Sequence, residues 1–356
     1  MMGANIARWF SQNRAFAGAI LMFLVLYIFY NFQHPAGFSS RVLVGNSNEA
    51  VGIGFVAMAQ AVPVLVGGLD LSVGAVMTMT SCLASILVDG TPLQIFFGII
   101  ATLGLGAAFG FMNGMIVVYG RIQPIIATLA TGALAIGIAL LLRPKPGGNV
   151  DGDLNWALTN SIWDFVDTYF DASNFDEDKW WFIAGIPVPL IVLFGVAFAV
   201  WLPFKKSVTG RTIYAIGSAE GSAYMSGLPI NRAKIAAFTL GGFFAACGGL
   251  FIAIQTSSGN ADIQQAGAYT LNSIAAVVIG GCSLMGGIGG AIGALIGALI
   301  LRVISYLFRL EFSLFGFDLS VDPLLQPLME GLVLLIAVSI GALRTLRVKN
   351  KLELFR

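Results

Sequence analysis

The sequence contains few charged residues and almost no histidine. Charged side chains make up 10% of its 356 residues, and His34 is the single histidine, whereas soluble domains carry about 25% charged residues. One histidine and no cluster of cysteine and histidine leave no ligand set for a transition metal. The apolar segments also contain no pairing of a nucleophile with a base. We therefore expect no catalytic residue, no metal site and no enzymatic activity in this chain.

Signals for disulfides and for phosphate binding are also scarce. The three cysteines, Cys82, Cys247 and Cys282, all lie in apolar segments, which is typical of small packing residues and not of disulfide partners. Neither glycine-rich run is followed by Lys-Ser or Lys-Thr, so there is no P-loop to hold the phosphates of a nucleotide. We expect this chain to hold no cofactor and to bind no nucleic acid.

Apolar residues are in large excess. They make up 57% of the chain, and the mean hydropathy is +0.87. Several apolar runs reach the ~20 residues that a membrane-spanning helix needs, and they lack the alternation of a barrel strand. Because lipid offers the backbone no hydrogen-bond partner, such runs form helices. The sequence predicts an all-α polytopic integral membrane protein, with residues 1–356 as a single transmembrane domain.

The apolar runs predict about ten transmembrane helices. The first follows Arg8 and Arg14 without a convincing cleavage site, so we interpret it as a retained span and not as a signal peptide. Forty-four glycines favour close helix packing and broken helices. The predicted spans are 15–33, 44–66, 71–88, 95–118, 122–142, 182–203, 233–255, 271–288, 289–308 and 324–343.

A polar, basic segment, residues 202–234, interrupts the apolar sequence. Its five basic residues accompany one acid, Glu220, and loops of this kind stay on the cytoplasmic side of a membrane. With the N-terminus inside, thirteen basic residues fall on the cytoplasmic side and five on the outside. The sequence therefore predicts cytoplasmic termini and a cytoplasmic loop at 204–232. We expect that loop to form a short surface helix on which a cytoplasmic partner docks.

The longest segment between spans, residues 147–181, is acidic and aromatic. It holds eight acids and one base, Lys179, and it is predicted to lie outside. Residues 160–169 favour a short amphipathic helix at the membrane interface, where tryptophan and tyrosine prefer to lie. Two interpretations stay open here: a solvated cap with aromatic anchors, or part of a docking platform for an external partner.

Asp70 is the notable charged residue within the apolar segments. An acid in a membrane is a candidate functional residue by default. The glycines around it, however, predict a break between two helices, with Asp70 capping the helix that starts near Ser72. Direct contact with a substrate stays an alternative. A second glycine-rich run, residues 280–290, predicts a similar break. The residues assigned to the two breaks are Gly67, Gly68, Asp70, Ser72, Gly74, Gly280, Gly281, Gly286 and Gly287.

Five motifs follow one another along the chain. They are Gly-Gly-Leu-Asp-Leu-Ser-Val-Gly (67–74), Met-Asn-Gly (112–114), Ile-Gln-Pro-Ile-Ile-Ala-Thr-Leu-Ala-Thr-Gly (122–132), Gly-Arg-Thr-Ile-Tyr-Ala-Ile-Gly (210–217) with Ala-Tyr-Met-Ser-Gly (223–227), and Ile-Ala-Ala-Val-Val-Ile-Gly-Gly-Cys-Ser-Leu-Met-Gly-Gly (274–287). In this order they resemble the permease subunit of sugar ABC importers of the ribose, xylose and galactose type, which is related to branched-chain amino-acid permeases. The resemblance covers about residues 45–343, and the acidic segment 147–181 is not part of its signature.

The resemblance implies partners and a location. The family combines two permease subunits, as a homodimer or heterodimer, with two cytoplasmic ATPase subunits and an external solute-binding protein, in the inner membrane of a bacterium. ATP and Mg²⁺ would then be bound by the ATPase partner, and the chain itself would contact membrane lipid. Residues 210–227 match the family's coupling segment, which fits a groove on the ATPase. The residues assigned to coupling are Arg211, Gly217, Glu220, Ala223, Met225, Ser226 and Gly227.

The resemblance also implies that the solute is a small neutral sugar. Neutral polyols need hydrogen-bond donors and acceptors and no fixed ion pair. Neutral polar residues of the second, fourth, fifth and eighth spans suit such a path, and each also suits a hydrogen bond between helices. The residues assigned to the path are Gln60, Asn113, Gln123, Asn272 and Ser273.

Other transport classes stay open at this point. The chain is also compatible with an ABC permease for a branched-chain amino acid or a nucleoside. An ion-coupled secondary transporter would explain the spans and the broken helices, but it needs ionisable groups across the membrane. Asp70 and Glu330 are the candidates for that role. Dependence of transport on ATP and on an ATPase subunit separates an ABC importer from an ion-coupled secondary transporter.

Overall fold

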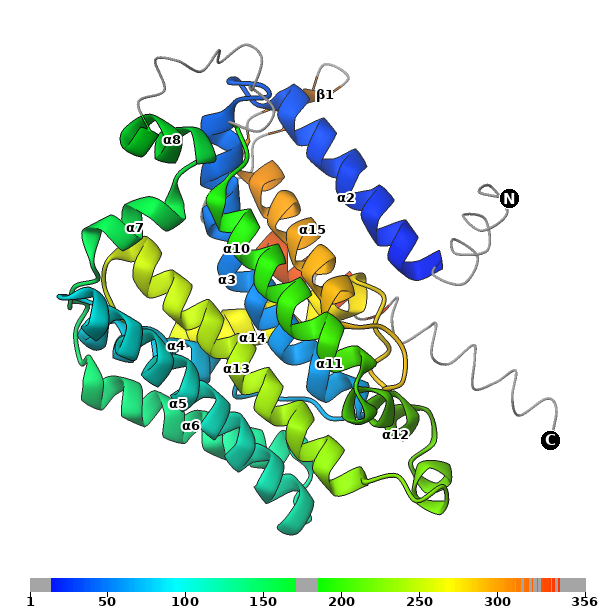
Figure 1. The fold of residues 1–356 in the computed structure, drawn as a ribbon. Coiled ribbons are helices and arrows are strands. Elements are labelled where there is room, and N and C mark those ends of the chain that lie inside the picture. Colours follow the sequence, from blue (N-terminus) through cyan, green and yellow to red (C-terminus); the bar gives the residue numbers. More distant parts are fainter. Residues whose placement is uncertain are drawn as a thin grey trace.

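The computed structural model describes residues 14–170 and 185–310 and, beyond them, residues 312–314, 317–319, 322, 325, 328–333, 335, 336 and 339. These residues form a bundle of helices (Figure 1). In chain order the helices are α2 (Arg14–Gln33), α3 (Ser40–Leu65), α4 (Val73–Leu87), α5 (Pro92–Tyr119), α6 (Pro124–Leu142), α7 (Gly152–Thr159), α8 (Ile162–Phe170), α10 (Val188–Val196), the π-helix η2 (Ala197–Trp201), α11 (Leu202–Lys206), α12 (Val208–Met225), α13 (Ile230–Thr256), α14 (Ile263–Ile279) and α15 (Ala291–Arg309).

Helix α3 is the centre of the bundle. Every residue from Ala50 to Leu65 is buried, and α3 packs against α4, α10, α13, α14 and α15. A helix that is apolar on all sides suits such a position. The hydrophobic core of the molecule forms around this helix.

Seven of the described helical segments are long and apolar enough to cross a membrane, by length and composition. The outward faces of α2, α5 and α6 carry exposed leucine, isoleucine and phenylalanine side chains, which suits contact with lipid tails. The protein is therefore a multi-pass helical membrane protein, and the predicted fold class is confirmed. The seven segments are Phe16–Gln33, Ser40–Leu65, Pro92–Tyr119, Pro124–Leu142, Val188–Lys206, Ile230–Thr256 and Ala291–Arg309.

Helices α4 and α14 are shorter than these seven. They have 15 and 17 residues, which is about 22 and 26 Å at 1.5 Å per residue, less than the ~30 Å of a hydrocarbon core. Each adjoins a glycine-rich break: residues 66–72 precede α4, and residues 280–290 follow α14. These are the broken helices that the glycine-rich runs predict.

The boundaries predicted for the span at 271–288 are wrong. Helix α14 runs from Ile263 to Ile279. The apolar run continues beyond it, but Gly281 has a φ of 87°, and a glycine in this conformation ends a helix. The tenth predicted span, 324–343, lies largely outside the described residues, so a count of ten is not confirmed.

Two short helices cover the end of the bundle opposite α12 (Figure 1). The N–H of Leu154 donates to Oδ1 of Asp151 at 2.9 Å at the start of α7, and the N–H of Ser161 donates to Oδ2 of Asp164 at 2.9 Å at the start of α8. Two of the acids therefore cap helices. Helix α8 confirms the short helix predicted at 160–169, and residues 171–181 of the acidic segment lie outside the described residues.

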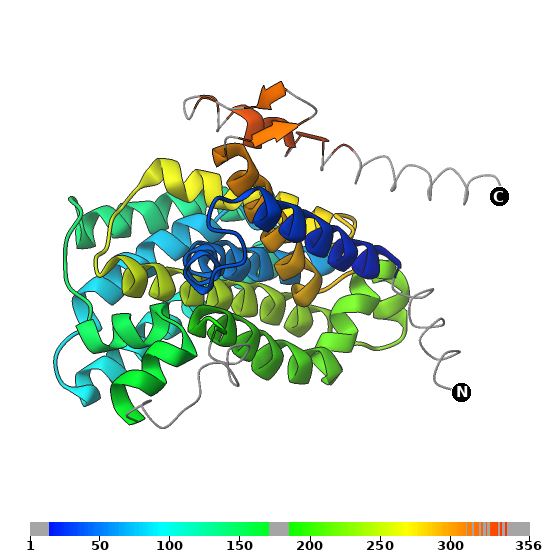
Figure 2. The same ribbon diagram turned by 90° about the horizontal axis from the view of Figure 1, so that it is seen from above.

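The two sides of the bundle pack differently. Helix α2 lies on the outside against α15 (Figure 2). Past α15 follows a small antiparallel hairpin of β1 (Phe312–Leu314) and β2 (Phe317–Leu319), which was not predicted from the sequence. On the other side α5 packs so closely along α13 that a Cβ atom on Gly110 would collide with the carbonyl oxygen of Phe238. Small residues of this kind let membrane helices approach one another.

Candidate functional site

Three helices, α3, α12 and α14, end in the same glycine turn. Gly67, Gly227 and Gly281 follow these helices with φ values of 76°, 72° and 87°. In each case the N–H of the next residue bonds to the carbonyl oxygen five residues back, which satisfies a free carbonyl at the helix end. The three bonds are Gly68 to Pro63, Leu228 to Ala223 and Cys282 to Val277.

Helix α12 contains the surface helix predicted for the basic segment. It begins after Ser207, whose Oγ accepts the N–H of Gly210 at 3.0 Å. It bends at Ala219, where φ is −163° and ψ is 94°. The bend divides α12 into a partly buried first part, residues 208–218, and an exposed tip, residues 220–227.

The first part of α12 touches the end of α3 and the second glycine-rich break. Gly217 lies against Leu65 at the end of α3 and against Gly286 and Gly287 in the second break. A Cβ atom at position 217 would collide with the carbonyl oxygen of Leu65 and the nitrogen of Gly287. Glycine, without a Cβ, is therefore required at this position. We call the contact of Leu65, Gly217, Gly286 and Gly287 the glycine junction.

Hydrogen bonds hold the glycine junction together. The N–H of Gly287 donates to the carbonyl oxygen of Leu65 at 3.0 Å, and the hydroxyl of Tyr214 donates to the carbonyl oxygen of Gly289 at 2.8 Å. Burial raises the pKa of the Tyr214 phenol, so the hydroxyl stays protonated and keeps donating at neutral pH. Since the junction consists of backbone contacts, a displacement of α12 must move the end of α3 and the second break as well.

The tip of α12 exposes large side chains. Tyr224 is 73% exposed and Met225 is 85% exposed. Glu220 forms an ion pair with Lys234 of α13 at 2.6 Å, which attaches the tip to that helix. Ala223 is buried, so its side chain is not available at the surface of the tip. The residues assigned to coupling that lie at the surface are Arg211, Glu220, Met225, Ser226 and Gly227.

At the first break, Asp70 lies in a buried polar cluster. Its Oδ1 accepts the N–H of Ser72 at 2.8 Å and the Ser72 hydroxyl at 2.5 Å, and Nδ2 of Asn113 donates to Oγ of Ser72 at 2.8 Å. The N–H of Leu71 donates to Oγ1 of Thr128 at 2.9 Å. Side chains of α5 and α6 therefore hold the start of α4. Asp70 binds the residue that precedes α4, Ser72, and not the free N–H groups of the helix itself.

Two of the residues assigned to the path carry buried polar atoms that lack a partner. Gln60 of α3 is fully buried, and neither Oε1 nor Nε2 has a hydrogen-bond partner among the described residues. Oδ1 of Asn113 is also buried and unpaired in this part of the chain. Such atoms are rare in folded proteins and call for water or a ligand. These amide groups can hydrogen-bond to water or to a polar solute, and their place in the path stays a prediction.

The other three residues assigned to the path have different surroundings. Ser273 is buried, but its hydroxyl donates to the carbonyl oxygen of Thr270 in the same helix at 2.6 Å. Asn272 is half-buried and lines a small cavity with Arg302 of α15. Gln123 is exposed directly before α6. No hydrogen bond among the described residues joins any of these three to Gln60 or Asn113.

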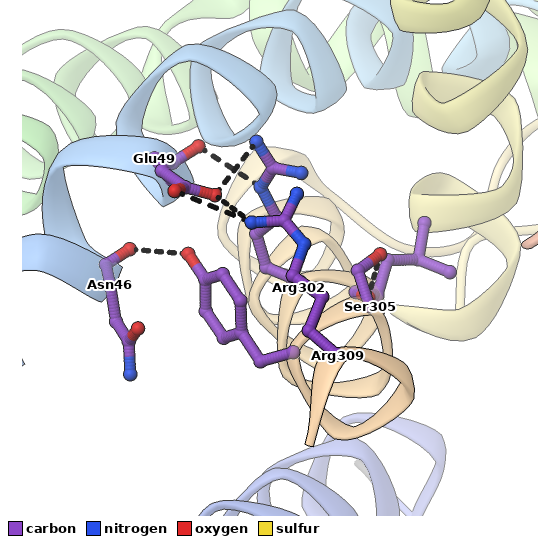
Figure 3. Close-up of polar contacts among 7 residues, drawn as sticks. Asn46, Glu49, Arg302, Ser305 and Arg309 are labelled. Atoms are coloured by element: carbon purple, nitrogen blue, oxygen red, sulfur yellow. Dashed lines mark hydrogen bonds and ion pairs between the residues drawn. The ribbon is translucent and has the colours of Figure 1, made fainter. Parts of the chain in front are cut away.

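A charged cluster that was not predicted from the sequence lies at the end of the bundle opposite α12. Figure 3 shows Glu49 of α3 facing Arg302 and Arg309 of α15. The Oε2 atom of Glu49 lies 3.5 Å from Nη2 of Arg302 and 3.2 Å from Nη1 of Arg309. Between them, the hydroxyl of Tyr306 donates to the carbonyl oxygen of Asn46 at 2.8 Å. The spacing 302, 306 and 309 places these side chains on one helix face, and this pattern is the signal that was available in the sequence.

Comparison with known proteins gives consistent matches over most of the chain. Residues 42–338 match the family described as branched-chain amino acid transport system / permease component. The ribose import permease protein of Haemophilus influenzae is 32% identical over 286 residues, 80% of this chain and 81% of the relative. That of Escherichia coli K12 is 31% identical over 284 residues, 79% and 80% of the two chains. The autoinducer 2 import system permease protein of Escherichia coli HS is 28% identical over 257 residues, 72% of each chain. No solved structure matches.

Proposed function

The chain belongs to the family of permease components of branched-chain amino acid transport systems, and from this membership we propose that it is the membrane-spanning permease subunit of an ATP-driven ABC importer. The proposed solute is a small neutral sugar, since the relatives include ribose and autoinducer 2 import permeases. The unpaired amide atoms of Gln60 and Asn113 support this solute class, because neutral donors and acceptors suit hydroxyl groups.

The energy for import comes from partners in this proposal. Two cytoplasmic ATPase subunits bind ATP and Mg²⁺, an external solute-binding protein delivers the sugar, and a second copy or a paralogue completes the membrane part. The α12 end, with loop 204–232 and both termini, then faces the cytoplasm of a bacterium, and segment 147–181 faces outward. A cysteine introduced at Asp167 should react with an impermeant reagent added outside, and one at Tyr224 should not; the reverse pattern would reject this orientation.

The glycine junction is the observation that carries the proposal. The exposed tip of α12 is available for a partner, and the first part of the same helix contacts the end of α3 and the break before α15. A partner that moves the tip together with the first part of α12 would therefore move the end of α3 and the break before α15. This is the mechanical connection that an importer driven by a separate cytoplasmic ATPase subunit requires.

The test uses the assembled complex, with the ATPase subunits and the binding protein, in vesicles. Met225→Glu places a charge on the exposed tip, and we expect a loss of ATPase docking of about tenfold or more, as for a central interface residue. Val208→Glu, at the opposite end of α12 and 61% exposed, is the matched control and should dock normally. Full docking and full ATP-driven sugar uptake by the Met225→Glu complex would overturn the coupling assignment.

A branched-chain amino acid is the second candidate solute, because the family description itself names this class. Competition between ribose and leucine for ATP-driven uptake in the same vesicles separates the two. Uptake of either solute that continues without ATP, driven by an ion gradient, would instead support the secondary transporter.

A further inference from the structure

An apolar groove runs along the outside of α13. Its floor is one stripe of that helix, in which Arg232, Ala236, Thr239 and Phe243 follow one another at helical spacing. One wall is α5, and the other is formed by η2 and α11. Figure 1 shows α13 in front, with α5 on one side and α11 on the other. The groove has a volume of about 630 Å³, which is within the usual range for a ligand site, roughly 300–1,000 Å³.

The walls of the groove are apolar. Phe111 of α5 is 49% exposed and faces Val200 of η2 and Phe204 of α11 across it. The hydroxyl of Thr239 donates to the carbonyl oxygen of Ile235 in its own helix at 2.9 Å, so it presents its methyl group. The lining therefore favours hydrocarbon over any polar ligand.

The length of the groove matches one leaflet of a bilayer. Its floor extends from Arg232 to Phe243, which is about 16 Å at 1.5 Å per residue. Half of a ~30 Å hydrocarbon core is about 15 Å. Arg232 lies at the α12 end, where α13 begins, so a chain that starts at Arg232 would end near the middle of the membrane.

The mouth of the groove is positively charged. Arg232 is exposed and forms no ion pair among the described residues. Lys206, just past Phe204 on the opposite wall, is also exposed. The nearest acid in sequence on α12, Glu220, is already paired with Lys234. The mouth therefore has cations available for a negatively charged group.

We propose that this groove binds an anionic phospholipid from the leaflet at the α12 end, with one acyl chain between α5, α13 and α11 and the phosphate on Arg232. An acyl chain accounts for the apolar walls and for the length, and the phosphate accounts for the unpaired arginine. A ridge from a second copy of the chain is the competing occupant, and the test below separates it from a lipid.

The test is native mass spectrometry of the assembled complex after purification with added phosphatidylglycerol or phosphatidylcholine. Wild type should retain phosphatidylglycerol in preference to phosphatidylcholine. Arg232→Gln should weaken retention about fivefold, the usual contribution of one basic residue at an anionic lipid surface. Ala236→Phe, which fills the floor, should remove the retained lipid. Arg121→Gln, another exposed basic residue of the same side, is the control and should behave like wild type.

Two results would overturn the proposal. One is equal retention of the two lipids by wild type and by both groove variants. The other is a disulfide between two permease copies through Thr239→Cys, formed in high yield in the membrane, which would show that a second copy covers the groove. The native cysteines Cys82, Cys247 and Cys282 are buried and do not interfere. Neither readout depends on the transported solute.

Discussion

The two ends of the bundle connect α3 and α15 to their surroundings in different ways. At the α12 end, the glycine junction joins Leu65, Gly217, Gly286 and Gly287 by backbone contact. At the opposite end, Glu49 contacts Arg302 and Arg309 through long side chains, and Glu49 is 39% exposed. The glycine junction is closely packed and contains no charged side chain, whereas the contact at the opposite end is charged and partly solvated.

This difference has a mechanical consequence. Long side chains that form an ion pair can adjust by rotation without separating. Exposed ion pairs also contribute little to stability, about 0–1 kcal/mol. Backbones in contact have no such freedom, because protein interiors are close-packed and transmit displacement. The α12 end is therefore suited to transfer movement, and the opposite end is suited to hold two helices loosely together.

The largest effect is expected from adding one methyl group at the glycine junction. Gly217→Ala forces a Cβ atom into the backbones of Leu65 and Gly287, and overpacking of this kind costs about 1–3 kcal/mol. We expect ATP-driven uptake to fall at least tenfold relative to ATP hydrolysis. Gly221→Ala, on the same helix with open space around it, is the control. Equal uptake by both variants would contradict a rigid junction.

A smaller effect on ATP-driven uptake is expected at the first break, next to the junction. Asp70→Leu leaves the buried N–H and hydroxyl of Ser72 without their acceptor, a loss of about 1–3 kcal/mol in stability. Asp70→Asn keeps an acceptor oxygen and should lose much less. Thermal unfolding of the complex and uptake should be measured together. If both variants were stable and equally inactive, the negative charge itself would be required, in favour of ion coupling.

The smallest effect is expected at the opposite end. Glu49→Gln removes the charge but keeps the backbone carbonyl that accepts from Nε of Arg302 at 3.2 Å. Stability should drop by about 1 kcal/mol or less. The difference in stability between wild type and variant should vanish in 1 M salt, where the Debye screening length is about 3 Å. A drop as large as that of Gly217→Ala, or one that persists in high salt, would show that the two ends are equally rigid.

Part of the candidate site follows from local sequence. Gly67, Gly281 and Gly227 stand where a helix ends with positive φ, and glycine next to an apolar run predicts such an end. Gly227, which was assigned to coupling, is exposed and also ends α12, and its part in coupling stays a prediction. The predicted span 271–288 begins and ends too late in the chain compared with α14 (Ile263–Ile279). Hydropathy reports apolar composition and does not detect a turn made of apolar and glycine residues.

Tertiary packing explains the remaining differences. Ala223 and Met225 are two residues apart and lie on different faces of α12, and the packing of the tip buries the first while the second is 85% exposed. Gln60 and Ser273 are both neutral and buried, but only Gln60 lacks hydrogen-bond partners among the described residues. Such distinctions depend on which helix packs beside each residue.

The sequence by itself determined the class of the protein, the approximate place of most helices and the positions of the two breaks. These properties follow from hydropathy and from backbone preferences, which depend on residues close together in the chain. Only the tertiary structure decided that Gly217 meets Leu65 and Gly287, and that Glu49 meets Arg302 and Arg309. Those contacts join residues far apart in the chain, and their partners become identifiable only once the helices are packed.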